Sequence, residues 1–266
     1  MKDRKTVEIK ILDISIWRIF VYFILYSIAG FAIETIYGII TMGIWQSRQS
    51  FLYGPFCGIY GLGAVLIILF SKYFNKNNFT LFVGGCLLGM TVEYLTSFFV
   101  EVMLHTRWWD YSARMLNVNG RICLLYTAFW GVLTIFLIKR FNPFVDRLVN
   151  KIKNRMLDKT LKIFLIVTIL FIFLDCLITC YAQDKFLTRM IVENNIEVND
   201  INKRYVDYEK LKSNPIITGV IEKLWNNEKM IKTFPNIKVE DKNNNVIYID
   251  SLLPDIQPYY LKIFDK

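Results

Sequence analysis

Four acidic residues lie in, or at the end of, apolar stretches of this 266-residue sequence: Glu34, Glu93, Glu101 and Asp175. A carboxylate inside the hydrocarbon core of a membrane costs roughly 2.5 kcal/mol or more, so it persists where it faces a bundle interior or a wet cavity, or where it is protonated. In such a place it can line or gate a transport path, or act as a general acid or base.

Arg121 begins another apolar stretch and is the obvious counter-ion for one or two of these carboxylates. Two interpretations are open. The charges line a polar cavity, which is the default expectation for ionisable groups inside a membrane. Alternatively, they form a buried ion network that fixes the register of the helices. We favour the cavity.

One face of the segment around Glu93 combines packing with polarity. Glu93, Ser97 and Glu101 are spaced four residues apart and therefore stack on one helix face. Gly85 and Gly89 continue that face toward the start of the helix. This spacing of small residues lets a neighbouring helix approach closely.

A second candidate feature is a group of glycines at the start of the second apolar stretch. Gly54, Gly58 and Gly61 flank Pro55, a residue suited to the first turn of a helix. These glycines either allow close helix packing, which we favour, or expose backbone amides to an anion. The stretch is not a phosphate-binding P-loop, because no Lys-Ser/Thr pair follows it.

The loop over residues 103–120 is aromatic and polar at once. Its candidate recognition residues are His105, Trp109, Asp110, Tyr111, Asn117 and Asn119. The loop is either an interfacial aromatic belt or a structured lid that recognises a ligand.

The elements that must position these residues are five apolar segments. The expected spans are about 16–42, 55–74, 79–101, 121–139 and 162–183. With 54% hydrophobic residues, the sequence predicts an all-α membrane protein with five transmembrane helices. Residues 1–13 form a cytoplasmic N-terminal segment, 14–183 the membrane domain, and the basic stretch 139–162 a surface helix.

Residues 184–266 are polar, and we expect a small α+β extracytoplasmic domain there. We predict helices near 186–208 and 214–228 and a hairpin near 237–249, turning at Asn243–Asn245.

The distribution of basic residues predicts the orientation. One side, comprising the N-terminal segment, the 72–76 loop and the 139–162 segment, has 15 lysines and arginines, against 4 in the opposite loops. The positive-inside rule therefore places the N-terminus in the cytoplasm and the tail outside. The polar features then gather in the outer half, which predicts an outward-opening cavity roofed by the 108–120 loop. The net charge of +9 follows topology, so nucleic-acid binding is disfavoured.

Several classes of chemistry are excluded by the residue inventory. The five cysteines form no CxxC pair and there is a single histidine, so neither a disulfide framework nor a zinc or His-rich metal site is expected. No cofactor is predicted, and the sequence has no Walker motif and no visible nucleophile–base motif.

Five motifs in order resemble a known family. They are Gly-Phe-x-x-Glu from Gly30 to Glu34, Gly-Pro…Tyr-Gly-x-Gly from Gly54 to Gly63, the Glu93 helix, Trp109-Asp110-Tyr111-Ser112, and Asn117-x-Asn119-Gly120-Arg121-Ile122. Over about residues 14–182 the chain resembles the ABC-transporter type IV, or CmpB-like, membrane permease family. The resemblance implies a bacterial multi-pass permease of the cell membrane that relies on a separate ATPase subunit.

Three functions remain open. The favoured one is the permease component of a transporter, which with five spans needs a homodimer to enclose a large pore. The second is an outer-leaflet enzyme acting on a lipid-linked or envelope substrate, with Glu93 or Glu34 as general acid or base and Asp110 or His105 as further candidates. The third is a non-catalytic assembly or sensor subunit. We consider an enzyme the less favoured class.

Overall fold

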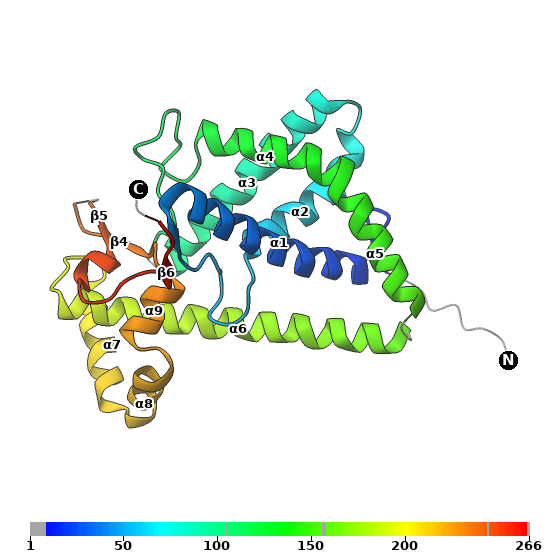
Figure 1. The fold of residues 1–266 in the computed structure, drawn as a ribbon. Coiled ribbons are helices and arrows are strands. Elements are labelled where there is room, and N and C mark those ends of the chain that lie inside the picture. Colours follow the sequence, from blue (N-terminus) through cyan, green and yellow to red (C-terminus); the bar gives the residue numbers. More distant parts are fainter. Residues whose placement is uncertain (1–8, 105, 156–157, 244, 265–266) are drawn as a thin grey trace.

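A computed structural model describes residues 9–104, 106–155, 158–243 and 245–264 (Figure 1). Within these residues, four helical stretches are long and apolar enough to cross a membrane: Ile16–Met42, Asn78–Leu104, Leu124–Lys151 and Lys159–Glu193. The corresponding elements are α1 (Ile16–Met42), α3 (Asn78–Leu104), α4 (Leu124–Phe136) with its continuation, and α6 (Asp158–Glu193). The chain is therefore a mainly helical membrane protein. His105 lies outside the described residues.

The second segment differs from the expected full span over 55–74. Helix α2 runs only from Gly58 to Phe70 and ends in the 3-10 turn η1 (Ser71–Tyr73). Its 13 residues cover about 20 Å, less than the ~30 Å hydrocarbon core. The helix cannot extend backward through Gly54-Pro55, because Gly54 has a left-handed φ of 81° and the residue before a proline avoids helical geometry.

The fourth segment continues past the expected boundary at Lys139-Arg140. After α4 the chain forms the π-helical turn η2 (Leu137–Phe141) and then α5 (Asn142–Arg155). Pro143 lacks an N–H and its ring crowds the preceding turn, and a π turn relieves this conflict without ending the helix.

Helix α6 is longer than the expected 162–183 span and ends by a capping motif. Asn195 is left-handed (φ 53°), the Ile196 amide donates to the Ile191 carbonyl at 2.9 Å, and the Asn195 amide donates to Val192 at 3.3 Å. This Schellman arrangement stops the helix. The predicted single helix over 186–208 was therefore wrong, because α6 ends at Glu193 and α7 begins at Ile201.

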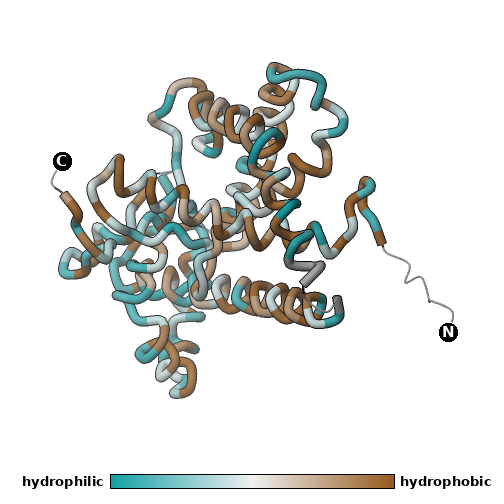
Figure 2. The backbone as a smooth tube through the Cα atoms, turned by 45° about the vertical axis from the view of Figure 1, so that its right-hand side comes forward, coloured by the Kyte–Doolittle hydropathy of each residue, from teal (hydrophilic) through white to brown (hydrophobic). Residues whose placement is uncertain are grey.

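The tail folds into a small α+β unit around its own apolar core. It contains α7 (Ile201–Ser213), α8 (Pro215–Leu224), α9 (Asn227–Thr233), the 3-10 turn η3 (Ile249–Leu252) and the antiparallel pair β4 (Lys238–Glu240) and β5 (Val246–Tyr248). This pair confirms the predicted hairpin. The core includes Phe186, Met190, Ile231 and, from the membrane domain, Leu52. Figure 2 contrasts the brown helices of the bundle with the mixed teal of the tail.

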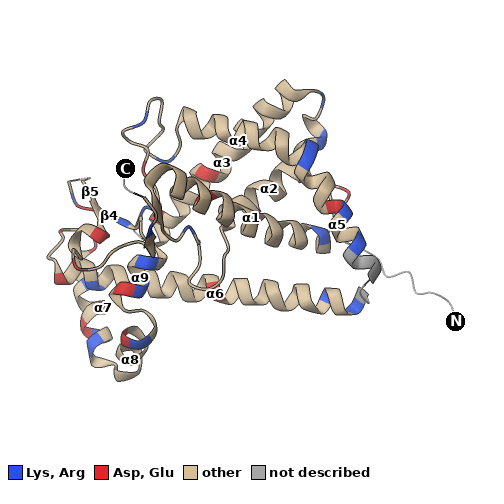
Figure 3. Cartoon of the chain, in the orientation of Figure 1, with Lys and Arg blue, Asp and Glu red and all other residues tan. Residues whose placement is uncertain are grey.

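Different elements meet at the two ends of the bundle. At one end, the start of α1 contacts α5 through Arg18 and Asp146 at 3.4 Å; the two-residue strands β1 (Lys10–Ile11) and β2 (Ile14–Ser15) lie just before it. At the other end, β3 (Ile44–Trp45), after α1, pairs with β6 (Leu261–Lys262) of the tail. Figure 3 shows α6 nearly free of charged residues between these ends.

Candidate functional site

The second apolar segment begins as an irregular, bent chain and continues as a helix. After β3 the chain runs without helix from residue 46 to 57, and α2 begins at Gly58. The Cys57 amide donates to the Ser27 carbonyl at 2.9 Å, which sets the start of α2 level with the middle of α1. The Ser50 hydroxyl accepts the Gly58 amide at 3.0 Å and so satisfies one free N–H of the helix start.

Asp175 on α6 holds this irregular segment in place. The residue is 2% exposed, and one carboxylate oxygen accepts the Tyr53 amide at 3.1 Å. Beside it, Thr179 accepts the Leu52 amide at 2.8 Å and donates to the other Asp175 oxygen at 3.3 Å. These side chains satisfy backbone groups that have neither helix nor sheet partners there. Asp175 is thus a positioning residue for the segment.

Glu34 is held by an aromatic pair. The Tyr60 hydroxyl donates to Glu34 Oε1 at 2.5 Å, and the Tyr60 ring stacks on Trp130 with centroids 5.6 Å apart. A Cβ at Gly30 would lie 2.3 Å from the Tyr60 Cβ, so glycine is required beneath this ring. Glu34 forms no ion pair within the described part of the chain.

Glu93 on α3 is also bonded by a tyrosine. It is 5% exposed, its Oε1 accepts the Tyr111 hydroxyl at 2.9 Å, and its Oε2 is buried without a hydrogen-bond partner among the described residues. Burial and the Glu93 charge raise the pKa of Tyr111 well above its usual value, so the hydroxyl remains a donor.

Glu101 has different surroundings from Glu34 and Glu93. Its Oε2 lies 3.0 Å from the Arg121 NH2 atom and 3.2 Å from Arg107 Nε. Arg107 also reaches Glu240 of β4 at 2.8 Å. Arg121 therefore pairs with Glu101, and its guanidinium also lies over the Tyr94 ring, 5.4 Å from the centroid. Arg121 was expected as a counter-ion for one or two of the carboxylates, and its partner in this network is Glu101.

The 106–120 loop is folded by its own polar residues. Asp110 accepts from both the amide and the hydroxyl of Ser112, at 3.0 and 2.6 Å, and Tyr111 donates its amide to the Gly120 carbonyl at 2.7 Å. The Asn117 side chain accepts the Gly120 amide at 3.1 Å. Burial tends to raise the pKa of Asp110, but the bonds from Ser112 and the nearby positive charges lower it below its ordinary value.

Other loop residues connect the loop to its surroundings. Trp109 donates its indole N–H to the Arg121 carbonyl at 2.9 Å, and Asn119 donates to the Tyr94 hydroxyl at 3.1 Å. Toward the tail, the Arg107 amide donates to the Lys238 carbonyl at 3.2 Å. The loop is therefore a structured element that joins the end of α3 to the tail.

The candidate glycines serve packing and turning. A Cβ at Gly61 would lie 2.6 Å from the Phe23 carbonyl oxygen, and one at Gly89 would lie 2.2 Å from Trp130, so α1 and α4 approach these positions closely. Gly54 provides the left-handed turn before α2, and Gly58 begins the helix. These contacts agree with the packing interpretation.

Sequence reasoning did not identify two residues of this region as site residues: Tyr60 and Arg48. Tyr60 stood inside the glycine motif, but nothing in its spacing linked it to Glu34. Arg48 packs against Gly38, one turn after Glu34, where a Cβ would lie 3.1 Å from its NH2 atom. Within the described residues its Nε is buried without a hydrogen-bond partner, and its NH2 atom donates to the Met42 sulfur at 3.4 Å.

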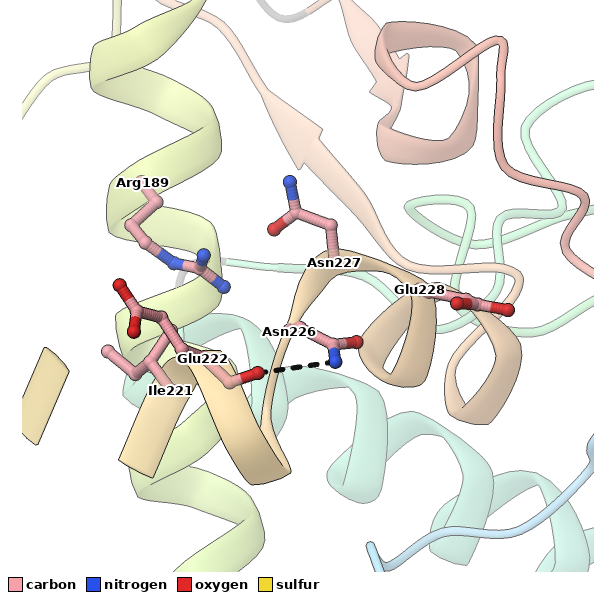
Figure 4. Close-up of a pocket in the computed structure, with 6 residues that line it drawn as sticks. All are labelled: Arg189, Ile221, Glu222, Asn226, Asn227 and Glu228. Atoms are coloured by element: carbon pink, nitrogen blue, oxygen red, sulfur yellow. Dashed lines mark hydrogen bonds between the residues drawn. The ribbon is translucent and has the colours of Figure 1, made fainter. Parts of the chain in front are cut away.

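A separate hollow of about 390 Å³ lies in the tail, remote in sequence from these carboxylates. Arg189, Glu222 and Asn227 are among the residues that line it (Figure 4). Asn226 donates across its floor to the Glu222 carbonyl at 3.4 Å. The hollow is open, and none of the carboxylates described above lines it.

The fold and the site define a class: a helical membrane protein in which tyrosines donate to a partly buried carboxylate, Glu34, and a buried one, Glu93, near the start of a short helix. Residues 21–180 match the model of the family described as "Putative ABC-transporter type IV", and the chain belongs to this family. The match confirms the resemblance seen in the sequence motifs. The family's description is that of an ABC-transporter component, which agrees with the apolar helices. No curated protein and no solved structure matches the chain.

Proposed function

We propose that this chain is the membrane-embedded permease component of a transporter. Its substrate site lies in the outer half of the bundle, around Glu34 and Glu93 and beside the start of α2. The observation that carries the proposal is the interruption of the second segment, where α2 begins level with Ser27 in the middle of α1. In many secondary transporters, substrate sites are likewise formed where a helix begins or ends within the membrane beside unwound backbone.

The irregular chain before α2 favours a wet cavity. Irregular backbone at membrane depth is tolerated where it is buried in protein or lines water. Tyr53, Gly54 and Pro55 are exposed, so this part of the segment is not fully buried in protein. Elsewhere in the bundle, Ser27 Oγ and Glu93 Oε2 are buried without hydrogen-bond partners among the described residues, and each such group is costly unless a polar ligand reaches it.

In this proposal the irregular chain and α2 together make a fifth crossing, over residues 43–73. The basic end of the bundle, with Arg18 and α5, faces the cytoplasm, and the outer loop and tail lie outside. The protein then resides in the cell membrane of a bacterium. Because the sequence has no Walker motif, ATP hydrolysis is supplied by a separate subunit.

Copurification tests the transport assignment. The protein is extracted from its native membrane in mild detergent, and the mass and composition of the complex are measured. A stoichiometric ATP-binding subunit supports the proposal, and the mass distinguishes one copy of this chain from two. Recovery without an ATPase, or with an envelope enzyme, would overturn it.

Cysteine labelling tests the cavity and the topology separately. Tyr53→Cys is expected to react with a small water-soluble thiol reagent added outside the cell. Ile166→Cys, on the 57% exposed apolar side of α6, serves as the lipid-facing control and should stay unlabelled. Asn243→Cys should react from outside and Asn75→Cys only after the membrane is opened. Equal labelling of Tyr53→Cys and Ile166→Cys would contradict a wet cavity.

A further inference from the structure

Helix α8 in the tail carries an apolar strip that the described part of the chain leaves uncovered. Ile216, Val220 and Leu224 are spaced four residues apart and therefore lie along one face of α8. Ile216 is 78% exposed, Leu224 is 53% exposed and Val220 is half-buried. A Cβ at Gly219, near this strip, would meet no atom of the described residues within 4 Å. A contiguous apolar strip, unlike a single exposed side chain, marks an interaction surface.

The C-terminal end of α8 lies where α6 leaves its apolar stretch. Trp225, which follows α8, packs on Tyr181 of α6 with ring centroids 5.9 Å apart. Its carbonyl also accepts from Arg189 of α6 at 3.2 Å. Tyr181 directly precedes Ala182, the last residue of the apolar stretch in α6. Tyrosine and tryptophan are enriched at membrane–water boundaries, so this contact sets the end of α8 at the level of the lipid headgroups.

The tail hollow shows which way the apolar strip faces. Ile221 and Glu222 of α8 line the hollow together with Arg189, which is eight residues beyond Tyr181 in the direction away from the apolar stretch. The hollow is therefore on the outward side of α8. Successive helix residues are rotated by about 100°, which places Ile216 on the side of α8 opposite the hollow. The apolar strip thus faces back toward the membrane, and Figure 4 shows α8 running across the direction of α6.

The surface of α6 next to the strip favours lipid as its partner. Leu177 and Ile178 are exposed on α6, a helix long and apolar enough to cross a membrane. One turn further along, Tyr181 is 42% exposed and carries this lipid-facing surface to Trp225. Lys223 is exposed beside the strip, where its flexible side chain can reach lipid phosphates.

We propose that α8 is an interfacial helix that rests on the bilayer surface, with Ile216 and Leu224 inserted at the boundary between headgroups and acyl chains. Short amphipathic helices bind membranes in this way, with the apolar face buried about 5–10 Å. The contact anchors the tail beside α6 and limits how far the tail can move from the outer end of the bundle. Only the choice of the outer leaflet rests on the proposed function, through the orientation given there.

Fluorescent labelling in lipid vesicles tests the contact. Ile216→Cys and Glu222→Cys are each made on a background in which the five native cysteines are serine, labelled with a nitrobenzoxadiazole dye and reconstituted. Lipids with a nitroxide near the top of the acyl chain should quench the label at position 216 severalfold more than the label at position 222. Glu222 is the matched control, because it is exposed on the opposite side of the same helix. Equal quenching at the two positions would overturn the proposal.

Hydrogen exchange in lipid nanodiscs tests the contact without replacing the cysteines. The amides of residues 216–224 should exchange about tenfold faster in Ile216→Asp than in the wild type, the effect of one large apolar side chain losing lipid contact. Aspartate is favourable near the start of a helix, so the change itself does not weaken α8. Residues 201–213 of α7 are the internal control and should exchange alike in both proteins. Unchanged exchange in α8, or an equal acceleration in α7, would overturn the proposal.

Both measurements are made without an ATPase, so their failure is distinct from failure of the transport proposal. That proposal depends on copurification.

Discussion

Glu93 and Glu101 lie two turns apart on one face of α3, yet their surroundings are opposite. Glu101 meets two guanidiniums, at 3.0 and 3.2 Å. Glu93 receives one tyrosine hydroxyl and keeps a buried oxygen without a partner. The comparison teaches that the neighbours of a carboxylate, and not its place in an apolar stretch, separate an ion network from a group able to bind something else.

The Glu101 region and the region of Glu34 and Glu93 connect different parts of the molecule. One ion network connects the end of α3, the 106–120 loop with the start of the next segment, and the tail hairpin. Its members are Glu101, Arg107, Arg121 and Glu240. Glu34 and Glu93 instead sit where α1, α2, α3 and α4 pack, held by tyrosines that stack on further aromatic rings. Removing a member of the first region should affect stability, and removing a member of the second should affect function.

The largest effect is expected from Glu101→Gln. It leaves two largely buried guanidiniums without the carboxylate they share, and breaking such a pairing costs about 3 kcal/mol. The free energy of unfolding, measured by denaturant titration in a fixed detergent, should fall by about this amount. Glu93→Gln is the matched control and should change it by less than about 1 kcal/mol, because the amide oxygen still accepts from Tyr111. An equal loss of unfolding free energy in the two variants would contradict the difference proposed between Glu101 and Glu93.

A smaller but functional effect is expected from Glu34→Gln and Glu93→Gln. In the complex copurified with its ATPase and returned to lipid vesicles, each change should lower transport-coupled ATP hydrolysis about tenfold, the size of one lost charged contact. Glu209→Gln, on the exposed surface of α7, controls for the substitution itself. Wild-type activity in both site variants would assign these carboxylates a purely structural role.

Tyr60→Phe should have a modest effect on stability. The variant keeps the stacking on Trp130 but leaves Glu34 without its donor, at a cost of about 1 kcal/mol. Tyr111→Phe makes the same change at Glu93 and should cost a similar amount. Thermal unfolding of both variants checks this; an unchanged Tm in each would mean that the hydroxyls do not hold the carboxylates.

The smallest expected effect is a pH dependence of the opening free energy of the loop that contains Asp110. The folded pKa of Asp110 is lowered from its ordinary value of 3.8, so its contribution is present above that value and is lost as pH falls through the folded pKa. Hydrogen exchange over residues 110–121 should be slower in the wild type than in Asp110→Asn at pH 7, by about 0.5 kcal/mol or less in opening free energy. The difference should shrink below pH 3.8. A gap that persists there would exclude the charge as its origin.

Much of the architecture was predictable because it depends on local pattern. Apolar length alone identified α1, α3 and α6, and the hairpin of β4 and β5 followed from alternating residues around an asparagine turn. The ends of elements were harder. The left-handed geometry of Asn195 ends α6, because it lets the Ile196 amide donate to the Ile191 carbonyl. Pro143 does not end its helix, because the π turn before it accommodates the proline ring.

The site was predictable in its residues but not in its pairings. Glu34, Glu93, Glu101, Arg121 and Asp175 stood out because charge in an apolar stretch is costly wherever the helices finally lie. The partner of each was undetermined, because periodicity specifies the face of a helix but not the neighbour that the face meets. Tyr60 and Arg48 have ordinary sequence surroundings, and only their proximity to Glu34 makes them notable.

Sequence by itself determined that this chain belongs in a membrane, where its apolar helices lie and which side chains are expensive to bury, since these depend on composition and spacing. Tertiary structure alone decided that α2 starts level with the middle of α1, that Asp175 bonds irregular backbone and that Arg121 pairs with Glu101. Those outcomes depend on the distances between segments far apart in the chain, and a carboxylate's role depends on whether a cation lies within about 4 Å of it.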